Sequence, residues 1–149
     1  MKNSLVAGYK DQYEAIIESI TNITEEQSLI SPTPNINLPH WILGHILVAR
    51  LNILVLLGES SIYPAEIFRL FIPGSTPVIN NSNTISFTKL TNDFISIHVR
   101  FLEILSDKET DLEKIIDGKS VVGHLLTYLT HEAFHAGQLS ILADVLNTA

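Results

Sequence analysis

The sequence predicts an all-α protein, a four-helix bundle with a long crossover between its second and third helices. Four long segments carry apolar residues at helical spacing, and no segment alternates in the manner of a strand. About 25 residues separate the second and third segments, which suits a crossover better than a tight turn. A short helix is expected within it, over residues 65–70. The length of 149 residues favours a single domain, 1–149.

The first two predicted helices lie on either side of a polar loop. The first spans residues 3–22, where apolar side chains recur every three or four positions. Pro32 and Pro34 then interrupt the chain. The second helix is expected to begin near Pro39, because proline is favoured in a first helical turn, and to end at Gly58.

The third and fourth helices complete the bundle. The third is predicted to begin at Asn83 or Thr84 and to end at Leu105, with its apolar side chains in one arc of about 80°. The fourth begins after Gly118 and continues without proline to about Leu146.

Composition and charge exclude several classes of function. A net charge of −7 argues against nucleic acid as a partner. The absence of cysteine excludes disulfides, thiolate metal sites and a cysteine nucleophile. Residues 41–57 are apolar but short for a membrane span, and they contain His45, Arg50 and Asn52. We therefore interpret them as a buried helix of a soluble bundle and expect no membrane partner. No signal-peptide pattern follows Met1, so a cytoplasmic location is expected.

Two histidines on the last helix predict a metal site. His131 and His135 lie four residues apart, one turn apart on the same helical face, so their imidazoles can converge on a divalent metal ion. This face carries no Lys, Glu or Arg, unlike an ordinary solvent-facing stripe, and most of the remaining circumference is apolar. We interpret it as a functional face; a plain solvent face is the alternative. Its other members are Ser120, His124, Thr127, Tyr128 and Gln138.

His45 is the best candidate for the third ligand, because it shares an arc of its helix with apolar residues and so points into the core. Arg50 and His40 lie about 140° to either side and are expected to face outward. His98, inside the apolar arc of the third helix, is a candidate ligand or neighbour of the ligands. His124 lies about 10 Å along the axis from the nearer histidine of the pair, so we expect it deeper in the pocket or at its rim.

The same stretch matches the His-Glu-x-x-His pattern of zinc peptidases, in which Glu132 would be the general base. The extended form of that pattern needs glycine and histidine where Gln138 and Ile141 stand. No glutamate follows Glu132, and no edge strand is predicted to hold a peptide. We therefore disfavour a peptidase and keep Glu132 as a candidate neighbour of the metal ligands.

Three stretches of the chain carry a family resemblance. Residues 38–45 read LPHWILGH, residues 70–77 read LFIPGSTP and residues 131–139 read HEAFHAGQL. Together they resemble the DinB/YfiT-like metalloenzyme superfamily, in which the first stretch opens the second helix and ends in a metal histidine. The last stretch is similar to the family signature that supplies two more. The order and spacing of the elements fit nearly the whole chain.

The resemblance implies an up-down-down-up bundle and a metal site formed by His45, His131 and His135. It implies zinc, nickel or iron as the ion, with zinc favoured, and a homodimer, which the high hydropathy of the chain also suggests. Family members of known activity include transferases and isomerases that use low-molecular-weight thiols. A metal-dependent, thiol-dependent transferase acting on a small molecule is therefore the expected function.

The ligand set itself leaves the reaction open. Three neutral imidazoles leave at least one coordination position free, as in catalytic rather than structural zinc sites. That position could hold a hydroxide for hydrolysis or a thiol for transfer, and only the resemblance favours the thiol. A non-catalytic metal- or ligand-binding bundle is a further alternative, in which a group such as His98 would close the site. The candidate substrate contacts are Asn52, His98, His124, Tyr128 and Gln138.

Overall fold

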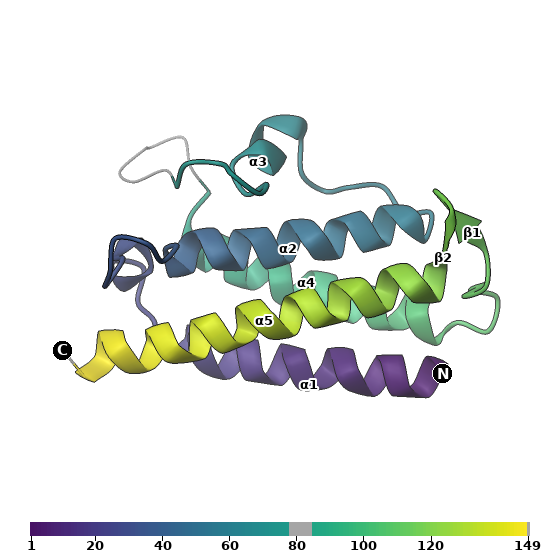
Figure 1. Cartoon of the computed structure of the whole chain (residues 1–149), viewed down its shortest axis with the longest axis horizontal. Helices are drawn as coiled ribbons and strands as arrows, with labels where there is room; N and C mark the ends of the chain where they lie inside the picture. Colours follow the sequence, from purple (N-terminus) through teal and green to yellow (C-terminus); the bar gives the residue numbers. More distant parts are fainter. Residues whose placement is uncertain (78–84, 149) are drawn as a thin grey trace.

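The computed structural model describes residues 1–77 and 85–148, and four long helices form a bundle within them (Figure 1). Helix α1 packs against α5, α5 against α2, α2 against α4, and α4 against α1. Figure 1 shows α1 and α5 running in one direction and α2 and α4 in the other, an up-down-down-up arrangement. The predicted all-α fold is confirmed. The bounds of these helices are Lys2–Thr21 for α1, Pro39–Leu56 for α2, Phe87–Ser106 for α4 and Val121–Thr148 for α5.

The long connection between α2 and α4 contains the short helix α3 (Ala65–Arg69), as the sequence predicted. The predicted start of the next long helix, at 83–84, lies outside the described residues. Helix α4 begins at Phe87, and the Ser86 hydroxyl caps it by accepting a hydrogen bond from the Lys89 N–H at 3.1 Å. This is an ordinary N-cap, which satisfies one of the free N–H groups of the first turn.

Two small elements were not predicted. A single 3₁₀ turn, η1 (Gln27–Leu29), follows α1, and a hairpin of strands β1 (Ile115–Ile116) and β2 (Lys119–Ser120) leads into α5. The expectation of no strand is wrong to this small extent. Asp117 and Gly118 form the hairpin turn with φ values of 50° and 76°, the left-handed backbone that a two-residue hairpin turn requires.

Helix α2 is covered on nearly all sides. It is the one described helix long and apolar enough to cross a membrane, and 83% of it is buried within the bundle. Helices α4 and α5 pack against it, and the connection that holds α3 runs along its outer side in Figure 1. The expectation that His40 and Arg50 face outward is therefore wrong, since they are 4% and 0% exposed. His40 Nε2 lies 2.7 Å from the Ile85 carbonyl oxygen, which precedes α4.

Candidate metal centre

Helices α2 and α5 bring His45, His131 and His135 together. The Nε2 atom of His131 lies 2.9 Å from that of His45 and 3.1 Å from that of His135. One ring nitrogen from each histidine lies within 4.8 Å of the other two, so the three are close enough to bind one metal ion. Histidine nitrogens bound to zinc at about 2.0–2.1 Å stand roughly 2.9–3.4 Å apart at ordinary coordination angles. Both observed separations fall within this range.

The hydrogen bonds of the other ring nitrogens direct two lone pairs at one point. His45 Nδ1 lies 2.6 Å from the Phe71 carbonyl oxygen, and His135 Nδ1 lies 2.7 Å from Gln138 Oε1. Oxygens of this kind only accept, so each Nδ1 donates its proton, and in a neutral ring each Nε2 then keeps a bare lone pair. Both lone pairs face His131 Nε2, which has at most one proton to offer. A cation held between the three nitrogens would satisfy all of them.

His131 differs from the other two histidines in its outer nitrogen. Its Nδ1 atom is buried and has no hydrogen-bond partner among the described residues. Burial, with His135 and His45 nearby, lowers the pKa of His131 to about 4. Burial also lowers the pKa of His135, against the opposing effect of its hydrogen bond to Gln138. Both rings are therefore neutral at pH 7, the form that binds a metal.

The segment after α3 packs beside His45 and holds it in place. The Trp41 ring stacks on the His45 ring, with centroids 4.7 Å apart and 13° between the planes. Trp41 Nε1 donates to the Ser75 hydroxyl at 2.8 Å, and this hydroxyl donates to the Leu70 carbonyl at 2.9 Å. The segment thus holds His45 through Trp41 and through the Phe71 carbonyl.

Gly44 permits this close approach. A Cβ atom at this position would lie 2.3 Å from two ring atoms of Phe71, whose side chain is 1% exposed. Only glycine leaves space for the ring against α2, because any side chain would displace it. The glycine before His45 therefore fixes where the carbonyl that orients His45 can lie.

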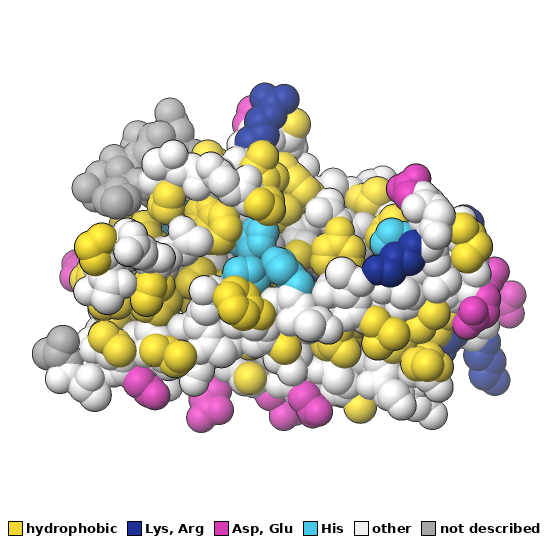
Figure 2. All heavy atoms as spheres, in the orientation of Figure 1, with side chains coloured by type: hydrophobic (Ala, Val, Ile, Leu, Met, Phe, Trp, Pro, Cys, Tyr) yellow, Lys and Arg dark blue, Asp and Glu magenta, His cyan; other side chains and the backbone are white. Residues whose placement is uncertain are grey.

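The centre is reached from solvent. Figure 2 shows histidine side chains at the surface between α2 and α5, with apolar side chains beside them. His131 is half-buried, while His45 and His135 are 7% and 8% exposed. Phe134 meets the His135 ring edge-on at 5.1 Å and is itself 64% exposed. The three histidines thus border solvent beside an apolar rim.

Glu132 is turned away from the centre. Its two oxygens accept from Arg50 Nε and Nη2, each at 2.6 Å, and it is 2% exposed. Glu132 is not one of the clustered metal-binding groups, and both of its carboxylate oxygens are taken up by Arg50. The sequence analysis missed Arg50 as its partner. A signal was present, since Arg50 is the only charged residue of α2 and must be paired when buried.

The remaining candidates lie in several places. Gln138 orients His135, as described above. His98 stacks on Tyr13 with centroids 3.7 Å apart and does not belong to the metal-binding group, so it does not close the site. His124 Nε2 lies 2.9 Å from the Ile116 carbonyl oxygen of the hairpin and also lies outside the group. The last two candidates, Asn52 and Tyr128, are both half-buried.

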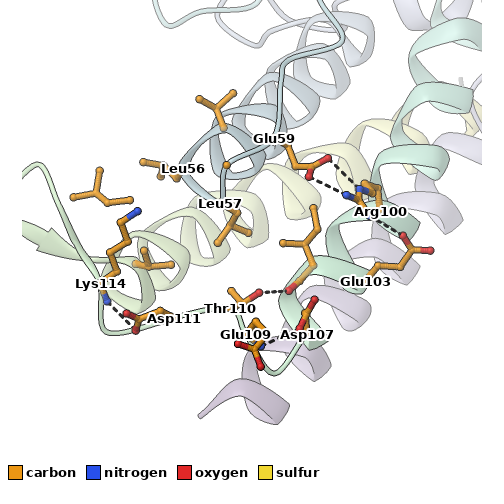
Figure 3. Close-up of a pocket in the computed structure, with 15 residues that line it drawn as sticks. Leu56, Leu57, Glu59, Arg100, Glu103, Asp107, Glu109, Thr110, Asp111 and Lys114 are labelled. Atoms are coloured by element: carbon orange, nitrogen blue, oxygen red, sulfur yellow. Dashed lines mark hydrogen bonds and ion pairs between the residues drawn. The ribbon is translucent and has the colours of Figure 1, made fainter.

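A groove of about 910 Å³ lies elsewhere, where the end of α2 meets the end of α4 and the segment before α5. None of the three clustered histidines lines it. Figure 3 shows Arg100 at one edge, where it binds Glu59 at 2.8 Å and Glu103 at 3.3 Å. These charges are satisfied by one another, and the groove holds no cluster of metal-binding groups among the described residues.

Comparison with known proteins finds no family model that matches the chain and no curated protein that matches it. The DinB/YfiT-like resemblance therefore stays a prediction from three short stretches of sequence. The case for function depends on the geometry of the histidines.

Proposed function

We propose that this protein holds one divalent metal ion on His45, His131 and His135 and uses it to activate a small molecule. The observation that carries the proposal is the close approach of His131 Nε2 to the Nε2 atoms of His45 and His135, at 2.9 and 3.1 Å. Protons alone do not satisfy such a group, whereas a cation does. Zinc suits three neutral imidazoles with an open position, and we favour it over nickel and iron.

The ion would supply Lewis acidity, lowering the pKa of a thiol or water bound to it. The protein would contribute orientation, because the N–H groups of His45 and His135 donate to the Phe71 carbonyl and to Gln138. Such outer hydrogen bonds fix the ring and raise the basicity of the ligand nitrogen. Phe134 provides an exposed apolar surface beside the open side.

The site disfavours a zinc peptidase, which needs a carboxylate as general base, because Glu132 is fully engaged by Arg50. The ion could activate either a bound water or a bound thiol, and the DinB-like resemblance favours the thiol. We therefore propose a metal-dependent, thiol-dependent transferase, with an apolar or weakly polar small molecule as the second substrate.

Metal stoichiometry tests the proposal. Elemental analysis of untagged protein is expected to give about one transition metal per chain. The variant His131→Ala/His135→Ala should lose it while circular dichroism stays helical, because the hydrophobic core is formed by other residues. His124→Ala is the matched control, since it removes a histidine of the same helix that lies outside the cluster. A wild-type protein that takes up no zinc, nickel or iron would refute the proposal.

The thiol is tested separately on the cobalt(II)-loaded protein. A small thiol added to it should produce a sulfur-to-cobalt charge-transfer band, because the thiolate enters the open position. The same titration of the His131→Ala/His135→Ala variant should show no such band. If the spectrum of the cobalt-loaded wild type did not change when thiol was added, the metal site would stand but the proposal of a thiol-dependent transferase would be refuted.

A further inference from the structure

A buried ion pair joins the two helices that carry the candidate metal ligands. Arg50 Nε donates to Glu132 Oε2 and Arg50 Nη2 donates to Glu132 Oε1, both at 2.6 Å. Arg50 is 0% exposed and Glu132 is 2% exposed. Two parallel bonds between a guanidinium and a carboxylate fix both distance and orientation, which a single bond does not.

The guanidinium is itself held from α1 and α4. Its carbon lies 4.7 Å from the ring centroid of Tyr9 and 4.8 Å from that of Phe101. Arg50 Nη1 donates to His98 Nδ1 at 3.3 Å, and Nη2 lies 3.5 Å from the Tyr9 carbonyl oxygen. The pair therefore has a fixed place relative to all four long helices.

The same pair lies close to the ligands along both helices. Glu132 directly follows His131, and Arg50 lies five residues after His45, about 7.5 Å along the axis of α2. Neighbouring side chains on a helix are separated by about 100°, so a fixed direction for Glu132 fixes the directions of His131 and His135. A rotation or slide of α5 that moved its histidines away from His45 would also strain the two 2.6 Å bonds. The bonds therefore resist such a movement.

We propose that Arg50 and Glu132 form a positioning pair for the metal centre. The pair sets the rotation and height of α5 against α2, and so the distance from His45 to the two histidines of α5. The inference rests on the proposed metal site. Buried ion pairs contribute little net stability compared with apolar side chains of similar volume. The effect of the pair should therefore show in metal affinity and geometry more than in stability.

Two variants separate this role from a merely structural one. Arg50→Met/Glu132→Met removes both charges together, so neither is left buried and unpaired. Arg50→Lys keeps the charge but loses the two-point geometry. Cobalt(II) is the probe, because its affinity is measurable by chelator competition and its visible spectrum reports coordination geometry. Thermal unfolding and circular dichroism measure the fold in parallel.

We expect the double variant to stay helical and to bind cobalt(II) about 10–100-fold more weakly, with an altered visible spectrum. Arg50→Lys should fall between it and wild type. The matched control is Arg100→Met/Glu59→Met, which removes a surface pair between α4 and the end of α2, remote from the histidines. It should leave both the affinity and the spectrum unchanged.

The outcomes distinguish the inference from the function on which it rests. Wild-type affinity and spectrum in the double variant would overturn the positioning role while leaving the metal site intact. If the double variant fails to fold, Arg50→Lys decides, and an unchanged affinity and spectrum there would overturn the inference too. A wild-type protein that binds no cobalt(II) would instead remove the metal site itself.

Discussion

At the scale of single residues, the candidate centre depends on the groups that hold its ligands. Gln138 accepts the Nδ1–H of His135 at 2.7 Å and so selects the tautomer whose Nε2 faces the centre. The backbone carbonyl of Phe71 does the same for His45. The Phe71 acceptor is a backbone atom, so only the Gln138 acceptor can be removed by a side-chain substitution.

We predict that Gln138→Leu weakens metal binding about 10–100-fold, because the ring of His135 loses the acceptor that orients it. Gln138→Glu should retain tight binding, since a carboxylate accepts the same proton. Chelator competition on both variants measures the effect, with circular dichroism as the check on folding. If Gln138→Leu bound metal as tightly as wild type, the hydrogen bond would have no part in the site.

At the scale of elements, the segment after α3 (residues 70–75) packs on α2 and orients His45. Gly44 carries this contact, because a Cβ there would enter the ring of Phe71 at 2.3 Å. The ring is buried and has little freedom to move. Any displacement of Phe71 also moves its carbonyl, the acceptor for His45 Nδ1.

We therefore predict that Gly44→Ala lowers the free energy of unfolding by about 1–3 kcal/mol, the usual cost of overpacking, and weakens metal binding as well. The matched control is Gly137→Ala on α5, where a Cβ meets nothing within 4 Å. That change should raise stability by about 0.5–1 kcal/mol, because alanine favours the helix. Denaturant unfolding measures both changes. Equal stability of Gly44→Ala and wild type would contradict the prediction that a Cβ at this position displaces Phe71.

The elements also show what a sequence can and cannot reveal here. The spacing of His131 and His135 is local, so helix geometry alone placed them on one face. Arg50 was misplaced because a helical wheel shows the direction of a side chain but not what covers it. The same limit applied to Glu132, whose partner is 82 residues away in the chain. The burial of His45 was predicted correctly because the residues on the same face of its helix are apolar.

At the scale of the whole molecule, the bundle interior combines a buried guanidinium with a buried imidazole. Arg50 Nη1 donates to His98 Nδ1, and His98 stacks on Tyr13 of α1. Burial, with the charges of Arg50 and Lys10, lowers the pKa of His98 to about 4 from an ordinary 6.5. His98 therefore stays neutral in the folded protein over a pH range in which the unfolded chain binds a proton.

This difference predicts acid sensitivity of a definite sign. Between pH 6.5 and about pH 4 the unfolded state takes up a proton at His98 that the folded state does not, so stability falls as the pH falls. Above pH 6.5 both states are neutral at this position and the contribution is flat. His98→Gln keeps an acceptor for Arg50 but cannot titrate, so its stability should fall less steeply over the same range. Denaturant unfolding in the presence of chelator compares the two proteins without bound metal, and equal slopes would mean that His98 titrates in the fold as it does in water.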